Sequence, residues 1–296
     1  MSNGQWYPPE WPDRIRALAA GTLTPATPRR AATVMLLRDA VSGGLEVHML
    51  RRRTSMAFAA GAYAYPGGGV DPRDDDRQVR WAGPALAVWA GRLGVPEKDA
   101  QAIVCAAVRE TFEEAGVLLA GPTPDSVVDD TTGADWQADR QALIGRDLSF
   151  AEFLQRRGLV LRSDLLGAWA RWITPEFEPR RYDTWFFAAA LPAGQRTSDD
   201  SSEADRTVWI GPERAASAYD QGELTMMPPT IATLRTLQEY VTARAALDGA
   251  AGRDLTPVLA QARFEDGELV LSWPGHDEFT KHIASGATGQ TGGTNR

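Results

Sequence analysis

The decisive stretch of this chain is R-E-T-F-E-E-A-G-V, residues 109–117. On a helix, Glu110 lies three and four positions before Glu113 and Glu114, so the three carboxylates share one face. Like charges on one face repel, which destabilises an isolated helix by roughly a few tenths of a kcal/mol per pair. A hard cation such as Mg²⁺ reverses that effect because it prefers oxygen ligands. The simpler alternative is a solvated acidic helix face without a ligand.

Two neighbouring features favour a bound cation. Arg109 adjoins the carboxylates, and Gly116 is placed to end a helix predicted from Asp99 to Ala115. Upstream, the run Pro66-Gly67-Gly68-Gly69 follows a predicted strand. Because glycine lets the backbone approach a ligand or metal closely, this run is a second candidate part of the same site.

These motifs resemble the Nudix hydrolase family. Residues 109–117 are similar to the second half of the Nudix box, and Tyr65-Pro66-Gly67-Gly68 resembles the strand end that precedes it. Gly68 lies 41 residues before Arg109, whereas the usual box separates them by about 14, so roughly 27 residues are inserted. A long insertion at this place resembles the branch that includes peroxisomal coenzyme A diphosphatases.

The segment before the box supports that branch and also departs from it. Arg53-Thr54, Phe58 and Gly61 are similar to the branch motif, whose second arginine has no counterpart here. A box glutamate is expected eight residues before Arg109, where this chain has Gln101. On this spacing, the glutamate that supports the box arginine is missing.

The resemblance implies specific roles. Glu110 and Glu114 are expected to bind Mg²⁺ or Mn²⁺, with Glu113 as ligand or helper and the Gly68 carbonyl as a further ligand. Arg109 is expected to hold the carboxylates. The general base is either a box glutamate or Glu203 on a polar loop, and the substrate is expected to meet four further residues: Arg53, Gly67, Gly68 and Gly69.

Composition limits the partners. The chain has 296 residues and a formal net charge of −8, which disfavours binding to an extended nucleic acid. A small nucleotide-type substrate is compatible with that charge, because one metal ion and a few arginines change the local field. No run of about 20 apolar residues or signal peptide is apparent, so we expect no membrane contact and a cytoplasmic location. Family members are often dimers, which makes a homodimer an expectation.

Cysteine and histidine offer no competing site. Cys105 is the only cysteine and falls on the apolar side of the predicted helix, so core packing is favoured over a nucleophilic role. His48, His276 and His282 are scattered and lack metal-ligand spacing.

The predicted fold is α/β (of the α+β type): a Nudix-like α/β/α sandwich with a mixed β-sheet and helical insertions. A mixed sheet is expected because a hairpin opens the fold, with strands at 31–38 and 45–51, before strands and helices alternate. Further helices are predicted at 80–93, 148–158 and 228–247, and further strands at 62–66, 167–175, 184–192 and 207–211. The expected divisions are an irregular arm at 1–28, a Nudix domain at 29–250 with insertions at about 70–98 and 121–165, a C-terminal β-hairpin extension at 251–284 and a disordered tail at 285–296.

Three functions are compatible with these patterns. The leading one is hydrolysis of a diphosphate in coenzyme A or an acyl-coenzyme A, with NADH or ADP-ribose next and oxidised nucleoside triphosphates less favoured. A non-catalytic nucleotide sensor on the same fold is the rival, although such modules usually lose box carboxylates. An acidic protein–protein adaptor is the third, and it predicts no glycine loop opposite the carboxylate helix.

Overall fold

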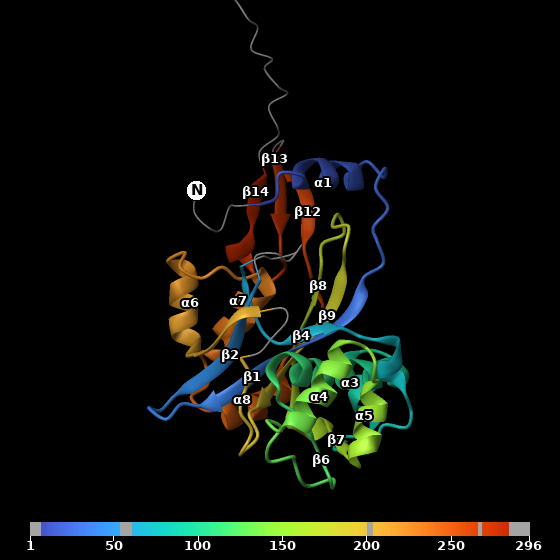
Figure 1. Ribbon diagram of the computed structural model, residues 1–296. Coiled ribbons are helices and arrows are strands. Elements are labelled where there is room, and N and C mark those ends of the chain that lie inside the picture. Colours follow the sequence, from blue (N-terminus) through green and yellow to red (C-terminus); the bar gives the residue numbers. More distant parts are fainter. Residues whose placement is uncertain (1–6, 54–60, 200–203, 266–267, 284–296) are drawn as a thin grey trace, which may run out of the picture. The chain divides into compact units, whose positions relative to one another are not determined.

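The computed structural model describes residues 7–53, 61–199, 204–265 and 268–283 (Figure 1). These residues fall into two compact units, each described by itself below. One unit contains Arg29–Trp172 and Tyr182–Pro257, and the other contains Met1–Pro28, Ile173–Arg181 and Val258–Arg296. The predicted disordered tail at 285–296 lies outside the described residues.

The larger unit is built on a mixed sheet, as the sequence predicts. Its strands run in the order β10-β2-β1-β9-β8. β1 pairs parallel with β9 and antiparallel with β2, and two short strands, β3 and β4, pair with β2 and β1. The bounds are β1 Arg29–Asp39, β2 Leu45–Arg52, β3 Tyr63–Ala64, β4 Gly67–Gly69, β8 Leu166–Ile173, β9 Tyr182–Ala190 and β10 Ala204–Ile210.

The opening hairpin is confirmed, and its turn shows why glycine is required. Gly43 and Gly44 have φ of 88° and 90°, a region that other residues rarely adopt. The turn is closed by a hydrogen bond from the Ala40 amide to the Gly44 carbonyl at 2.8 Å.

Helix α3 (Glu97–Ala115) is the centre of one face of this sheet. It packs against β1 and β4, and its buried side chains join the even-numbered side chains of β1 in one apolar cluster with Trp185 and Phe187 of β9. The opposite face is covered by α8 (Ala243–Gly249) and η4 (Ala250–Gly252), since a Cβ on Gly167 of β8 would lie 2.5 Å from the Ala250 Cβ. Helices therefore cover both faces, and the predicted α/β/α layering is confirmed.

Several predicted helices have different bounds. The helix predicted at 80–93 is a strand, β5 (Trp81–Ala82), and a helix, α2 (Leu86–Leu93), because Pro84 disfavours helical backbone before it. Helix α3 follows Pro96 and begins at Glu97, two residues before the predicted start at Asp99. The helix predicted at 228–247 is two helices, α7 (Pro228–Leu237) and α8, the second capped by the Thr242 side chain.

The two predicted insertions contain more regular structure than expected. Besides β5 and α2, the first holds a 3₁₀ helix, η2 (Pro72–Asp75). The second holds α4 (Ala134–Ile144), for which no helix is predicted, and α5 (Phe150–Arg157), which confirms the helix at 148–158. In Figure 1, α4 and α5 lie beside α3. The remaining elements of this unit are β6 Ala120–Gly121, β7 Val160–Arg162, η3 Ser163–Leu165 and α6 Pro212–Asp220, with β5, β7 and β6 forming a small sheet.

The smaller unit corrects two expectations. The predicted irregular arm contains a helix, α1 (Trp11–Ala19), whose Trp11 ring donates to Glu178 at 2.7 Å. The expected C-terminal hairpin is a three-stranded antiparallel sheet, because β14 pairs with β13 as well. Its turn at 266–267 lies outside the described residues. The bounds are β11 Val258–Leu259, β12 Gln261–Glu265, β13 Glu268–Ser272, η5 Asp277–Phe279 and β14 Lys281–Ile283.

No described helix is long and apolar enough to cross a membrane.

Candidate active site

The carboxylate face of α3 lies against the glycine strand β4, as the two sequence motifs predict. The Gly67 amide donates to Glu114 Oε2 at 2.8 Å. A Cβ on Gly68 would lie 2.6 Å from the Glu110 carboxylate, so only glycine leaves room for this packing. The adaptor hypothesis predicts no glycine segment opposite the carboxylate helix, and this contact contradicts it.

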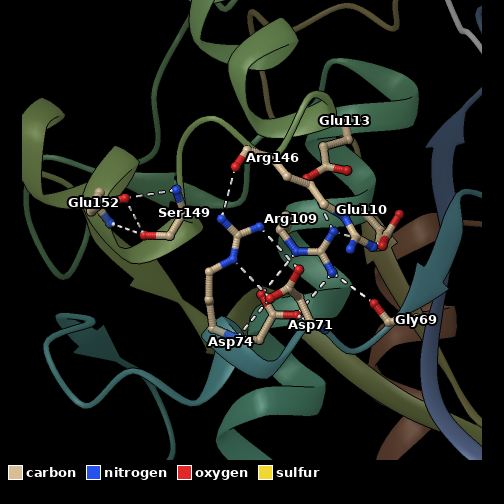
Figure 2. A network of polar contacts seen from close by, with 10 residues as sticks. Gly69, Asp71, Asp74, Arg109, Glu110, Glu113, Arg146, Ser149 and Glu152 are labelled. Atoms are coloured by element: carbon tan, nitrogen blue, oxygen red, sulfur yellow. Dashed lines mark hydrogen bonds and ion pairs between the residues drawn. The ribbon is translucent and has the colours of Figure 1, made fainter.

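Arg109 organises the carboxylates, as its predicted role requires. Its Nη1 donates to Glu110 Oε1 at 2.8 Å and to Glu113 Oε1 at 3.2 Å (Figure 2). Its Nη2 donates to the Gly69 carbonyl at 2.9 Å. A single guanidinium therefore joins two of the three carboxylates to the glycine strand.

Asp74, which the sequence analysis does not single out, completes this network. It receives two hydrogen bonds of 3.0 Å from Arg109, from Nε and from Nη2. Asp74 is 2% exposed and Arg109 is 9% exposed, so the pair is buried. Two parallel bonds between a guanidinium and a carboxylate fix both the position and the orientation of the arginine.

An aspartate, Asp74, therefore supports Arg109 in place of the expected glutamate. Gln101 does not contact Arg109, and its Nε2 donates instead to the Asp76 carbonyl at 2.6 Å. In the usual box the glutamate comes six residues after the glycine, and six residues after Gly68 is Asp74. The insertion separates this acid from Arg109, so counting back from the arginine leads to the wrong residue.

A short helix positions Asp74. Pro72 occupies the first turn of η2, and the Asp71 side chain accepts from the Arg73 amide at 2.9 Å. Asp74 Oδ2 in turn accepts from the Asp71 amide at 2.7 Å. This reciprocal capping box sets the Asp74 carboxylate toward α3. The signal in the sequence is D-P-R-D, a capping residue followed by proline and by an acid three positions on.

Burial governs the protonation of these groups. Burial raises the pKa of Glu110 to about 7, although the Arg109 guanidinium opposes the shift. Burial also raises the pKa of Glu113 and of Asp74 in spite of the same guanidinium. Burial alone would lower the pKa of Arg109, but its bonds to Asp74 and the charge of Glu110 outweigh this and raise it. Burial therefore disfavours the charged form of these carboxylates more than the single arginine favours it.

This donor set fits a hard divalent cation. Glu110, Glu113 and Glu114 offer carboxylate oxygens, the ligand type that Mg²⁺ and Mn²⁺ prefer, and burial disfavours their charge without a further cation. The three side chains do not converge: among the described residues no group of three His, Cys, Asp or Glu side chains is arranged to hold a metal ion. Arg109 donates to Glu110 and Glu113, and the Gly67 amide donates to Glu114.

The remaining predicted site residues are not part of the hydrogen-bond network around Arg109 described above. Arg53 is exposed, and its charge helps to lower the pKa of Asp205, which is set first by the hydrogen bond from Arg51. Glu203, Thr54 and Phe58 lie outside the described residues. Cys105 is fully buried, and burial raises the pKa of its thiol, which agrees with core packing.

Comparison with known proteins agrees with this geometry. A family model described as "NUDT19 Nudix domain" matches residues 90–237, half of the chain. The chain belongs to the Nudix hydrolases, in the branch of that domain, and is an enzyme of that class. Such enzymes generally use divalent metal ions.

The relatives include proteins named acyl-coenzyme A diphosphatase NUDT19 from Xenopus laevis, Gallus gallus and Homo sapiens. The protein from Xenopus laevis is 26% identical over 281 residues, covering 79% of this chain and 71% of the relative. The protein from Gallus gallus is 28% identical over 223 residues, covering 62% of this chain and 58% of the relative. Among solved structures, a NUDIX hydrolase from Alicyclobacillus acidocaldarius is 27% identical with a TM-score of 0.62, covering 78% of this chain and 99% of that one.

Proposed function

We propose that this protein hydrolyses the diphosphate of coenzyme A or an acyl-coenzyme A with the help of Mg²⁺ or Mn²⁺. The observation that carries the proposal is the packing of the α3 carboxylates on the glycine strand, held by Arg109 and Asp74. The names of the relatives support coenzyme A as the first substrate to consider. NADH and ADP-ribose share the diphosphate and come next.

Each residue has a defined task in this proposal. Glu110, Glu113 and Glu114 would hold the metal, with the Gly68 carbonyl as a further ligand. When bound, the metal would neutralise the diphosphate and lower the pKa of an attacking water. Arg109 keeps Glu110 and Glu113 oriented toward one another, and Asp74 keeps Arg109 in place. Gly67, Gly68 and Gly69, together with Arg53, are the proposed substrate contacts.

Two carboxylates are candidates for the base that removes the proton from water. A box glutamate is one, since Glu110, Glu113 and Glu114 lie on the helix face that would hold the metal and its bound water. Glu203 is the other. It is supported by a bond of 2.8 Å from the Ser198 amide to the Ala115 carbonyl, which brings the start of its loop to the end of α3.

A substrate panel tests this proposal. Coenzyme A, acetyl-coenzyme A, NADH, ADP-ribose and 8-oxo-dGTP would be incubated with the protein and Mg²⁺ or Mn²⁺, with products identified by mass spectrometry. We expect cleavage at the diphosphate, most efficient for the coenzyme A compounds, that stops on chelation of the metal and in Glu110→Gln. Tight nucleotide binding without cleavage of any member would instead support the nucleotide sensor.

The expected homodimer and cytoplasmic location stay predictions. Sedimentation of the purified chain tests the first, and fractionation of cells tests the second.

A further inference from the structure

Arg146 has an unusual backbone conformation beside the candidate site. It lies in the short loop between α4 and α5 and has φ of 63°. In the described part of the chain it is the non-glycine residue with a positive φ. A bulky side chain in this region is strained, and such strain persists where the surrounding structure enforces it.

Hydrogen bonds hold the loop in this conformation. The Arg146 amide donates to the Leu143 carbonyl at 2.9 Å, and the Asp147 amide donates to the Ala142 carbonyl at 2.9 Å. Arg73 Nη1 donates to the Arg146 carbonyl at 3.2 Å. The position of Arg146 is thus fixed from the loop itself and from η2.

Further hydrogen bonds connect this loop to α3, the helix that carries the carboxylates. Arg73 is held by Asp71 through Nε at 3.0 Å and Nη2 at 3.2 Å. Asp71 and Asp74 cap η2 reciprocally, and Asp74 holds Arg109. A continuous series of hydrogen bonds therefore runs from the Arg146 backbone to the side chain that orients Glu110 and Glu113.

The Arg146 side chain extends from its loop in the direction of the same carboxylates. Figure 2 shows it extending from the loop toward Glu110 and Glu113. The residue is exposed, and among the described residues its guanidinium forms no hydrogen bond or ion pair. Arg109, by contrast, donates to the carboxylates of Asp74, Glu110 and Glu113. An arginine that reaches an active site without pairing there is available to a ligand.

We propose that Arg146 binds the diphosphate oxygens of the substrate. The inference rests on the proposed function and deepens it, because it assigns a phosphate-binding residue to the α4–α5 insertion. A planar guanidinium matches phosphate oxygens with two parallel donors and stays charged at all relevant pH values. It also offsets the repulsion between a diphosphate and the α3 carboxylates.

Arg146→Gly separates a binding role from a structural one. Glycine adopts φ of 63° without strain, so the variant should unfold at the same temperature as the wild type or higher. We expect KM for acetyl-coenzyme A to rise about tenfold or more, and Arg146→Lys to recover part of that loss. Arg156→Gln is the matched control, since Arg156 is an exposed arginine on α5, and should leave KM unchanged.

A binding measurement without turnover separates this inference from the proposed function. Isothermal titration of methylenediphosphonate in Mg²⁺ should show binding by the wild type and about tenfold weaker binding by Arg146→Gly. Binding of this kind in a protein that cleaves no member of the panel would overturn the function and keep the inference. Unchanged KM and unchanged affinity in Arg146→Gly would overturn the inference alone, and a wild type that neither binds nor cleaves would overturn both.

Discussion

Arg109 on α3 and His48 on β2 are both buried polar side chains, but their surroundings are opposite. Arg109 donates to Asp74, Glu110, Glu113 and the Gly69 carbonyl. His48 is 0% exposed, and its two ring nitrogens are the buried side-chain atoms without a hydrogen-bond partner among the described residues. The His48 ring lies 5.2 Å from that of Trp209, its cross-strand neighbour.

The difference shows how partners decide the charge of a buried group. Burial opposes the charge on both side chains. The carboxylates around Arg109 outweigh that effect and raise its pKa. For His48, burial dominates over the charge of Asp199 and lowers the pKa to about 4. The protein therefore keeps a charged network at the site and a neutral ring on the sheet.

The largest expected loss of stability comes from breaking the charged network at Asp74. Asp74→Leu removes the two bonds to Arg109 and leaves part of a buried charge uncompensated, so the free energy of unfolding should fall by about 3 kcal/mol. We also expect kcat/KM to fall between about tenfold and 100-fold, because Arg109 no longer orients the carboxylates. Denaturant unfolding and steady-state kinetics measure both.

The neighbouring acid is the control for that variant. Asp75 pairs with Lys98 at the surface, an interaction of small value. Asp75→Leu should therefore leave stability and activity close to those of the wild type. Equal losses in the two variants would contradict a special role for Asp74.

The next effect is a dependence of the free energy of unfolding on pH, caused by the neutral side chain of His48. The folded pKa of His48 lies below its unfolded value of 6.5, so the unfolded chain binds the proton first and stability falls as pH falls from about 6.5 to 4. Between pH 7 and pH 5 the wild type should lose about 2 kcal/mol more than His48→Leu. Urea unfolding at several pH values measures this, and the exposed His282→Gln should follow the wild type. If the free energy of unfolding changed with pH equally in the wild type and His48→Leu, burial would not lower the pKa of His48.

A smaller effect is expected where the glycine strand meets α3. Gly68→Ala places a methyl group 2.6 Å from the Glu110 carboxylate, which Arg109 holds in place. We expect displacement of Glu110 and a loss of kcat/KM of about tenfold. A Cβ on Gly91 of α2, which has no part in the site, would meet nothing within 4 Å, so Gly91→Ala should keep full activity. Full activity in Gly68→Ala as well as in the control would contradict a role for the position of Glu110 in the reaction.

The smallest effect distinguishes the two candidates for the box acid. If Gln101 replaced a functional glutamate, Gln101→Glu would restore activity. Because Asp74 already holds Arg109, we expect kcat/KM to change by less than about twofold. A strong increase in kcat/KM, measured by steady-state kinetics, would show that position 101 and not Asp74 is the place of the acid that supports Arg109.

Local patterns are sufficient to predict the parts of the site that are close in sequence. Glu110, Glu113 and Glu114 share a helical face by spacing alone, and the glycine run predicts a close approach of backbone. The mixed sheet follows from the opening hairpin. These predictions succeed because each depends on residues that are close together in the sequence.

Asp74 and α4 could not be predicted in the same way. Asp74 meets Arg109 across 35 positions, and the insertion between them obscures the spacing. Helix α4 contains the fully buried Arg140, which donates to the Glu113 carbonyl at 2.8 Å. A buried arginine looks like an exposed one in sequence, because its partner belongs to another helix. Tertiary contacts decide both cases.

Under the proposed function, the α3 carboxylates catalyse metal-dependent cleavage of a diphosphate. The most direct test is the initial rate of acetyl-coenzyme A cleavage at one Mg²⁺ concentration by the wild type and Glu114→Gln. Glutamine keeps an oxygen that can accept from the Gly67 amide, so the variant should fold normally. The account predicts a rate at least about 100-fold lower in the variant. A folded Glu114→Gln with the wild-type rate would contradict it.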